Sequence, residues 1–318
     1  MGRVFAFFLL IAAVFAVFYF VKPSDFNFSS PIPKVFGATT SVVLINDWFP
    51  REPAFNRKSD FELSLSASSA ILVNFDTGEI LFAKNMQKRA PIASLTKIMT
   101  AVVALSEAKQ DAVFNVSPKA ATVGEDSMGL SGGERLTVEE LLYGLMLPSG
   151  NDAAVTIAEG VSGTEDAFVT RMNEEARKLG MNDTKFINAS GLDEDDRSQY
   201  STAYDVAVLS HFAMQNFEKF RQVVSTEHYT IDATGSHKAF DLYNETNLLT
   251  TYPGVRGIKP GFTWEAGLCL ATYAENKGVK LLGVMLGSDN RRGEMKEVLD
   301  YGFAKYGITV AHPALDLQ

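Results

Sequence analysis

The chain has 318 residues, of which 46% are hydrophobic, and it carries a formal net charge of −9. This length and hydrophobic content suffice for a buried core and for one or two domains. Because acidic residues outnumber basic ones and no long basic run occurs, the composition argues against a nucleic-acid partner. The single cysteine, Cys269, excludes an intrachain disulfide, and its apolar neighbours favour a buried, unreactive thiol.

The amino terminus carries an unbroken apolar run over residues 4–21, between Arg3 and Lys22. The run is at the lower limit for a membrane-spanning helix and longer than the apolar part of a usual signal peptide. The nearest small-residue cleavage site, around Ala38, lies far from it, so a retained anchor is favoured over cleavage. Residues 1–22 are therefore interpreted as an N-terminal membrane anchor or signal segment. Either interpretation exports the rest of the chain, to the periplasm or the cell surface.

The remainder divides into a linker, a globular region and a tail. Prolines and serines punctuate residues 23–60, which predicts a linker. Within it, the apolar run 42–45 suits either a short strand or a patch that docks on the domain. We expect a globular domain over residues 61–310 and a short tail over residues 311–318.

The order of the predicted elements indicates the fold class. A β-hairpin is predicted first, because apolar runs at 70–75 and 79–83 flank Asp76-Thr77-Gly78. Helices are predicted over 94–105, from the capping box at 137–140 to Pro148, and over 151–159, 165–179, 202–216 (amphipathic) and 295–303. Strands are predicted over 267–273 and 279–286, and a loop over 186–200. Strands at both ends with helices between them predict an α+β fold, in which one sheet is built from distant segments beside a helical insertion.

A serine and a lysine three residues apart open the first predicted helix. Residues three apart share a helix face, so the Ser94 hydroxyl and the Lys97 amine lie side by side. A neutral amine there takes the hydroxyl proton and makes the serine a nucleophile. Chance supplies about one S-x-x-K motif in a chain this long, and a second copy runs from Ser106 to Lys109 at the expected solvated end of the helix. The first copy is preferred because a helix N-terminus with free N–H groups and an apolar helix accompany it.

Two other short motifs carry polar side chains, and taken alone each is most simply a turn. These are Ser149-Gly150-Asn151, which also suits a helix N-cap, and Lys259-Pro260-Gly261-Phe262-Thr263. The stretch 129–133 matches the G-x-S-x-G nucleophile elbow but lacks a preceding strand and an immediate helix, so a loop is predicted. None of the four histidines has a partner motif for a Ser-His-Asp triad, and no His or Cys pattern indicates a metal site.

In the order S-x-x-K, S-x-N and K-x-G, the three motifs form the set found in penicillin-binding proteins and class A β-lactamases. The chain resembles the D-alanyl-D-alanine carboxypeptidases, low-molecular-mass penicillin-binding proteins of the S11 serine peptidase type. The similar segments, spread over roughly residues 66–304, are 93–101, 136–142, 147–154, 191–193, 200–203, 252–255 and 257–259. The resemblance implies the transpeptidase fold of penicillin-binding proteins and β-lactamases, an antiparallel sheet flanked by helices with a helical subdomain. Residues 61–310 are then the D,D-peptidase catalytic domain.

The resemblance also implies an activity: hydrolysis of peptidoglycan stem peptides that end in D-Ala-D-Ala, through an acyl-enzyme that β-lactams form too. In that scheme Ser94 is the nucleophile and Lys97 the general base. Ser149 relays a proton to the leaving amine, and Asn151 orients the substrate amide and the lysine. No metal or other cofactor is implied.

The opposite side of the cleft is implied to bind substrate. The residues implied there are Lys259, Gly261, Phe262, Thr263 and Arg291. The N–H groups of Ser94 and Phe262 would form the oxyanion hole. The departure from the family is Pro260, where a threonine hydroxyl usually helps to hold the substrate carboxylate. Recognition of the substrate carboxylate is then weakened, or transferred to Thr263 and Arg291. Arg292 is the alternative to Arg291 if the alignment with the family arginine shifts by one residue.

A proline at position 260 is compatible with a strand there. N–H groups alternate between the two edges of a strand, so those of residues 260 and 262 share an edge, which by resemblance faces the site.

Three other activities remain open. A β-lactamase shares the three motifs but needs a base for fast deacylation, and no E-x-x-L-N type element supplies one. A D,D-endopeptidase would cut D-Ala-linked crosslinks with the same residues. A catalytically weakened cell-wall-binding protein is suggested by Pro260 and would bind stem peptides without releasing D-Ala.

Overall fold

The structure is a computed structural model that describes residues 48–52, 63–194 and 198–313. The predicted anchor over 4–21 and the apolar run 42–45 lie outside these residues. Within the described ranges, no helix is both long enough and apolar enough to cross a membrane.

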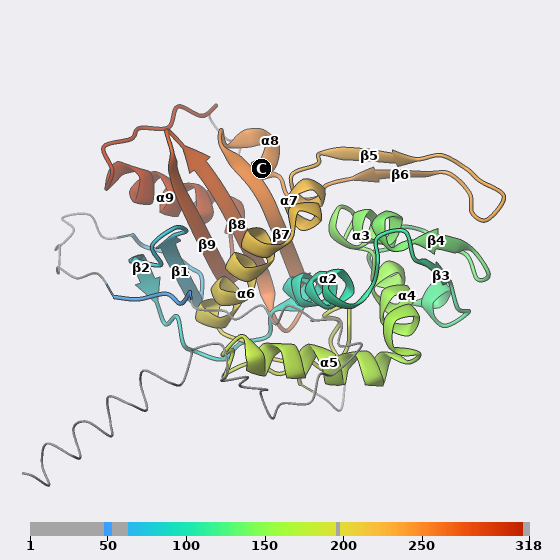
Figure 1. The fold of residues 1–318 in the computed structure, drawn as a ribbon. Helices are drawn as coiled ribbons and strands as arrows, with labels where there is room; N and C mark the ends of the chain where they lie inside the picture. The colour runs from blue at the N-terminus through green and yellow to red at the C-terminus, as the bar shows by residue number, and fades with distance from the viewer. Residues whose placement is uncertain (1–47, 53–62, 195–197, 314–318) are drawn as a thin grey trace, which may run out of the picture. The chain divides into compact units, whose positions relative to one another are not determined.

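A central antiparallel sheet joins the two ends of the domain, as predicted. Among the described residues it has five strands in the order β2-β1-β9-β8-β7 (Figure 1). Their bounds are β1 Ser69–Asn74, β2 Ile80–Lys84, β7 Val255–Thr263, β8 Gly267–Asn276 and β9 Val279–Ser288. The hairpin β1–β2 is fixed to the C-terminal strands because β1 pairs with β9 from Ser69↔Leu286 to Asn74↔Leu281. Because β7 comes last in the strand order, it is an edge strand that pairs only with β8 among the described strands.

Helices cover both faces of this sheet (Figure 1). On one face lies α9 (Arg291–Ala304), whose Met295, Leu299 and Phe303 join a core cluster with Leu72 and Met285 of the sheet. On the other face lie α2 (Thr96–Glu107) and α6 (Ala203–Asn216), within the larger core cluster. The α9 helix starts four residues earlier than predicted because Asn290 caps it, its side chain accepting from the Gly293 N–H at 3.0 Å.

The prediction that residues 202–216 form an amphipathic helix is right about the helix and wrong about its polarity. Thr202 caps α6, accepting a hydrogen bond from the Asp205 N–H at 3.0 Å. Its residues are buried on nearly every side, His211 and Ser210 included. The reason is its position, since α6 packs against β1, β8 and β9 of the sheet and also against α2 and α7 (Glu218–Val224).

A helical subdomain lies beside the sheet and carries α3 (Val138–Met146), α4 (Asn151–Ser162) and α5 (Glu165–Lys178). The predicted capping box is confirmed: the Thr137 hydroxyl accepts from the Glu140 N–H, and the Glu140 carboxylate accepts from the Thr137 N–H. Besides α7 and β7, the elements of the described residues that were not predicted are short, namely η3 (Ala120–Thr122), α8 (Leu248–Thr251), β3 (Val113–Asn115), β4 (Arg135–Thr137), β5 (His228–Ile231) and β6 (Phe240–Tyr243). Each is too brief to show a periodic pattern.

The described part of the predicted linker, residues 48–52, packs against the domain. The Arg51 N–H donates to the Gly78 carbonyl at 2.8 Å, and the Ile80 N–H donates to the Arg51 carbonyl at 2.9 Å. Trp48 stacks on the buried His211 ring with 3.8 Å between ring centroids. This segment is therefore held at both ends by the globular part of the chain.

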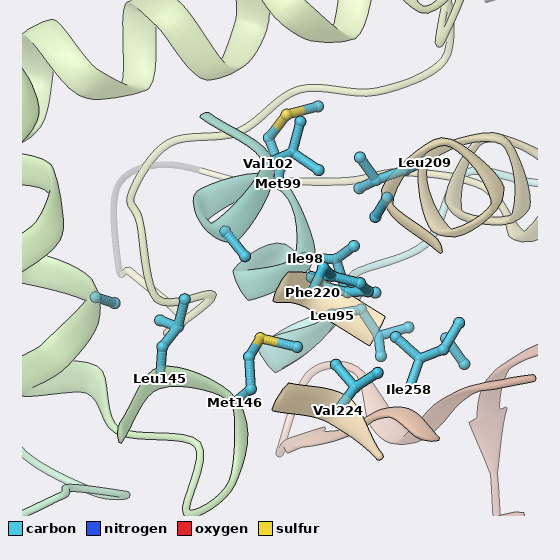
Figure 2. Close-up of a cluster of buried hydrophobic side chains, with 14 of the residues drawn as sticks. Leu95, Ile98, Met99, Val102, Leu145, Met146, Leu209, Phe220, Val224 and Ile258 are labelled. Carbon is cyan, nitrogen blue, oxygen red and sulfur yellow. The ribbon is translucent and has the colours of Figure 1, made fainter. Parts of the chain in front are cut away.

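Apolar side chains fix the position of α2 in the core. Leu95, Ile98, Met99 and Val102 recur at helical spacing and are fully buried. Figure 2 shows them among side chains from α3, α6, α7 and β7, including Leu145, Met146, Leu209, Phe220, Val224 and Ile258. Because this face is packed on all sides, the beginning of α2 has little freedom to move, and the polar side chains there are held in place.

Candidate active site

Ser94 lies in a short 3₁₀ turn directly before α2, the helix in which it was predicted. Ala93–Leu95 forms a 3₁₀ turn, η2, and α2 continues from Thr96. The turn starts with Ala93 in a left-handed conformation (φ +48°), a strained state for a residue with a Cβ atom. Ser94 keeps 9% of its surface exposed, whereas Lys97 has none. A serine at the edge of solvent thus adjoins a lysine sealed in the interior.

The Lys97 amine has three oxygen neighbours within hydrogen-bond distance. Its Nζ lies 2.9 Å from Ser94 Oγ, 2.7 Å from Asn151 Oδ1 and 2.8 Å from the Ser190 carbonyl oxygen. The last two atoms only accept hydrogen bonds, so they use two N–H groups of the amine. A neutral amine has two N–H groups and one lone pair, and the lone pair is then directed at the Ser94 hydroxyl.

The electrostatic environment favours that neutral form. Burial lowers the pKa of Lys97 well below its ordinary value of 10.5, and the positive charge of Lys259 lowers it further. The carboxylates of Asp126, Glu245 and Glu125 oppose this shift, but each has a smaller effect on the pKa than burial or Lys259. The predicted juxtaposition of the Ser94 hydroxyl and the Lys97 amine is therefore present in the structure.

The Ser149-Gly150-Asn151 motif connects α3 to α4 and contains the N-cap residue of α4, but no side chain of the motif caps the helix. Gly150 takes the cap position without a side-chain hydrogen bond, and Asn151 is the first helical residue. Asn151 Nδ2 donates to the Gly124 carbonyl at 2.9 Å, which leaves its Oδ1 facing Lys97. Ser149 is left-handed (φ +61°), and its buried Oγ has no hydrogen-bond partner among the described residues. Strain and an unsatisfied hydroxyl are both typical of functional sites.

A residue that sequence reasoning missed, Asp152, holds the facing loop. Its Oδ2 accepts from Ser127 Oγ at 2.6 Å, the Leu130 N–H at 2.8 Å and the Gly129 N–H at 3.0 Å. Its Oδ1 accepts from the Met128 N–H at 3.0 Å. The carboxylate thereby fixes the loop next to Gly124, on which Asn151 depends. An acidic residue in the first turn of a helix was the available signal, but it reads as an ordinary favourable helix charge.

The Lys259 motif lies in extended strand β7, so its reading as a turn is wrong. Lys259 and Gly261 pair with Ala271 and Cys269, whose side chains lie in the core on the α2 side of the sheet. Gly261 brings the strand against η2, since a Cβ atom there would lie only 3.0 Å from the Ser94 nitrogen. Pro260 is tolerated because β7 is an edge strand, as the N–H alternation argument required.

The Lys259 amine is buried without a hydrogen-bond partner among the described residues. Its residue has no exposed surface. The nearest carboxylate oxygen, Glu245 Oε2, is 3.9 Å away. Burial lowers the pKa of Lys259 to about 8, against the opposing effect of Glu245. An amine without a hydrogen-bond partner and the unsatisfied Ser149 hydroxyl therefore accompany the Ser94–Lys97 pair.

The remaining substrate-binding candidates are placed differently from one another. Arg291 reaches β7, where its Nη1 donates to the Gly261 carbonyl at 2.5 Å. Arg292 instead lines a polar pocket of about 190 Å³ with Asn244 and Thr246. The Thr263 hydroxyl donates to Asp193 Oδ1 at 3.0 Å and accepts from the Ala266 N–H at 3.1 Å. Phe262 is 46% exposed. Both side chains proposed to replace the missing hydroxyl are thus already hydrogen-bonded within the protein.

The second S-x-x-K motif and the G-x-S-x-G match both lie where the sequence predicted. Ser106 is exposed at the end of α2, and its hydroxyl donates to the Val102 carbonyl at 2.8 Å. The stretch 129–133 is a loop between η3 and β4. Neither contributes a side chain to the cluster around Lys97.

Comparison with known proteins identifies a family for the chain. The family model described as D-alanyl-D-alanine carboxypeptidase, Peptidase S11, matches residues 56–290. The D-alanyl-D-alanine carboxypeptidase DacF of Bacillus subtilis is 36% identical over 258 residues, which cover 78% of this chain and 65% of DacF. The D-alanyl-D-alanine carboxypeptidase of Streptomyces sp. strain K15 is 34% identical over 260 residues, covering 76% of this chain and 88% of that protein. The chain thus spans somewhat under two thirds of the length of DacF.

Solved structures show the same fold. The crystal structure of the Streptomyces K15 DD-transpeptidase has a TM-score of 0.72 and 32% identity, covering 77% of this chain and 99% of that one. The D-alanyl-D-alanine carboxypeptidase DacD of Francisella tularensis has a TM-score of 0.69 and 28% identity, covering 79% and 74%. These likenesses confirm the predicted α+β fold of the penicillin-binding-protein type. The chain therefore belongs to the S11 peptidase family, that of the D-alanyl-D-alanine carboxypeptidases.

Proposed function

We propose that the chain is a serine-type D-alanyl-D-alanine carboxypeptidase that acts on peptidoglycan stem peptides through an acyl-enzyme on Ser94. One observation carries the proposal: a fully buried amine, Lys97 Nζ, lies 2.9 Å from Ser94 Oγ with its other hydrogen bonds directed to pure acceptors. That arrangement suits a general base for a serine nucleophile. Family membership and the names of the relatives support the same substrate class.

The chemistry begins with acylation. Ser94 Oγ attacks the carbonyl carbon of the penultimate D-Ala while Lys97 takes the hydroxyl proton. The oxyanion is stabilised by the N–H groups of Ser94 and Phe262, which the close approach of Gly261 to the Ser94 nitrogen brings together. The C–N bond breaks, and the terminal D-Ala leaves as an amine that receives a proton through Ser149. Water, activated by Lys97, then hydrolyses the ester and regenerates Ser94.

Recognition of the substrate falls to β7 and to α9. The terminal carboxylate binds near Lys259, whose buried amine has no partner among the described residues. Arg291 supports this end of the cleft through its hydrogen bond to Gly261, and Thr263 through its bond to Asp193. β-Lactams, which also carry a carboxylate beside a reactive carbonyl, acylate the same serine. No metal or other cofactor takes part in any of these steps.

The substrate also implies a location. Peptidoglycan lies outside the cytoplasmic membrane, so residues 61–310 work as a catalytic domain in the periplasm or at the cell surface. The apolar run over residues 4–21 then attaches the enzyme to the cytoplasmic membrane or directs its secretion.

The proposal predicts covalent labelling at one residue. The purified protein is expected to form a denaturation-stable adduct with a fluorescent penicillin, on the peptide that contains Ser94. It is also expected to shorten a stem pentapeptide by one D-Ala in mass spectra. The Ser94→Ala variant should lose both signals, and Ser106→Ala, from the second S-x-x-K motif, should keep them. Equal labelling of Ser94→Ala and wild type, or no D-Ala release by wild type, would refute the proposal.

One observation favours a second function, that of a cell-wall-binding protein with weakened catalysis. Pro260 lies on the same side of the sheet as its partner Leu270, which belongs to the α9-side core, so residue 260 and Arg291 approach the strand from one face. By the family resemblance, a threonine hydroxyl at this position would help to hold the substrate carboxylate, a contact that Pro260 cannot make. A pure binding protein would retain stem peptides without releasing D-Ala.

Restoring that hydroxyl separates the two functions. Pro260→Thr is expected to lower KM for a peptide that ends in D-Ala-D-Ala by about tenfold, because a hydrogen bond to a charged group is added. The same peptide with a C-terminal carboxamide serves as the control and should show little change. A wild type that binds but never cleaves, beside a Pro260→Thr variant that cleaves, would establish the binding-protein function instead.

A further inference from the structure

Glu245 lies at the carboxylate-binding end of the cleft without having been recognised in the sequence. It lies between β6 and α8, and its N–H donates to the Leu147 carbonyl at 3.2 Å, directly before Pro148 and Ser149. The preceding Asn244 anchors the loop, because its Nδ2 donates to the Val224 carbonyl at 3.2 Å and to the Thr226 carbonyl at 2.9 Å. The backbone at Glu245 is thus fixed to the loop that carries Ser149, opposite β7.

The side chain of Glu245 contrasts with its fixed backbone. The side chain is 45% exposed, and its Oε2 lies 3.9 Å from the buried Lys259 Nζ, close enough for an ion pair and too far for a hydrogen bond. Moving the carboxylate into solvent would therefore break no hydrogen bond to Lys259. A partly exposed anion beside a buried cation that has no hydrogen-bond partner among the described residues has the properties of a replaceable counter-ion.

Other charges face the same lysine. Arg291 on α9 and Lys97 on α2 are the neighbouring cations, and Asp126, on the loop between η3 and β4, is a second carboxylate. After burial, Glu245 has the largest effect on the pKa of Lys259, which it raises; Asp126 raises this pKa less, and Arg291 lowers it. Glu245 also raises the pKa of Lys97. Glu245 is therefore the dominant negative charge acting on the amine proposed to bind substrate.

We propose that Glu245 is the resting counter-ion of Lys259 and a specificity-determining residue, which the terminal carboxylate of the substrate displaces on binding. This inference rests on the proposed function, because it identifies what the substrate carboxylate replaces. A carboxylate already close to Lys259 keeps the amine protonated in the free enzyme. The same carboxylate competes with any ligand anion, so that only a ligand with further contacts in the cleft displaces it.

The proposal requires opposite effects of neutralising Glu245 at low and at high pH. Where Lys259 is protonated in both proteins, the Glu245→Gln variant lacks the competitor and binds the substrate carboxylate more tightly. The substitution also lowers the pKa of Lys259, which is about 8 in the wild type, so the variant loses the cation at a lower pH. Binding of the carboxylate is therefore strengthened in mildly acidic solution and weakened in alkaline solution.

The experiment compares Glu245→Gln with Glu227→Gln and wild type. Glu227 is exposed and lies in the adjoining segment before β5, and its substitution removes the same charge. Unlike Glu245, it is not among the charged groups that act on Lys259. KM is measured from pH 5.5 to pH 9.5, on an acetylated peptide that ends in D-Ala-D-Ala and on its C-terminal carboxamide. Protonation of Lys97 affects the reaction of both peptides, whereas protonation of Lys259 affects only the peptide with a free carboxylate. The difference between the two pH profiles therefore reports on Lys259.

The expected result has three parts. At pH 6, Glu245→Gln lowers KM for the free carboxylate about threefold, in line with the modest strength of a partly exposed ion pair. The alkaline rise in KM moves down by about half a pH unit. Neither change is seen with the carboxamide or with Glu227→Gln. An unchanged or raised KM at pH 6, or an equal change with the carboxamide, overturns the proposal.

A second readout separates this inference from the activity itself. Binding of N-acetyl-D-alanine is measured by calorimetry on the full chain, without turnover. Tighter binding to Glu245→Gln than to wild type at pH 6 supports the inference even if wild type releases no D-Ala. Equal binding to the two proteins refutes it even if wild type is an active carboxypeptidase.

Discussion

Replacing Lys97 with methionine is expected to slow acylation of Ser94 by about 10³-fold or more, within the range by which general bases accelerate reactions. Methionine fills a similar volume but has no lone pair on nitrogen to accept the hydroxyl proton. The rate constant for labelling by a fluorescent penicillin measures the effect. Lys109→Met, which alters the lysine of the second S-x-x-K motif on the surface, is the matched control and should label at the wild-type rate.

Two pH profiles distinguish lost chemistry from lost folding. Because burial lowers the pKa of Lys97, wild-type acylation is expected to rise as pH rises through that lowered pKa, and the residual rate of Lys97→Met should lack this rise. The unfolded chain binds a proton on Lys97 up to about its ordinary pKa of 10.5, whereas the folded chain does not. The wild type therefore gains stability with increasing pH between the two pKa values, and the variant loses this contribution. A variant that labels normally, or that keeps the wild-type rate profile, would exclude Lys97 as the base.

The sequence predicted this half of the site because its geometry is local. Ser94 and Lys97 are three residues apart, and any helical turn places their side chains together. The apolar positions of the same helix predicted the buried side that anchors it. The 3₁₀ conformation of Ala93–Leu95 was not predicted. Gly191 lies against this turn, since a Cβ atom there would lie 2.1 Å from the Ala93 carbonyl oxygen, and no local pattern reveals such a distant contact. The exchange of an α-turn for a 3₁₀ turn leaves the pairing intact.

The other half of the site depends on tertiary contacts that no local pattern contains. Glu245 lies 3.9 Å from Lys259 only because the Glu245 N–H binds the carbonyl of Leu147, about a hundred residues earlier. Asp152 resembles an ordinary first-turn acid until the loop it holds is known. Read alone, the Lys259 motif suggests a turn because proline and glycine are turn formers. Its edge position in the sheet, which makes both residues acceptable in a strand, is set by the pairing of β8 with β9.

The second large effect is expected from a single methyl group at Gly261. A Cβ atom there would lie 3.0 Å from the Ser94 nitrogen, 3.2 Å from Ala93 Cβ and 3.3 Å from the Ile92 carbonyl oxygen. Two of these neighbours are backbone atoms, one of η2 and one of Ile92 directly before it, and they cannot rotate away as a side chain would. The clash is relieved only if β7 and η2 move apart by a few tenths of an ångström, which separates the N–H groups of Ser94 and Phe262.

Gly261→Ala is therefore expected to reduce kcat by about 10²-fold, comparable to losing one oxyanion-hole donor. KM for the D-Ala-D-Ala peptide should change much less, because Lys259 stays in place while the transition-state contacts are lost. Gly132→Ala is the control, since its added Cβ meets nothing closer than Pro118 at 3.8 Å. A large rise in KM with unchanged kcat would instead assign Gly261 to ground-state binding. The Gly261 carbonyl and the Phe262 N–H belong to the same peptide group, which the hydrogen bond from Arg291 holds in place. This N–H therefore cannot turn back toward the oxyanion once β7 has moved. A normal kcat in a stably folded Gly261→Ala protein would mean that Phe262 supplies no oxyanion donor.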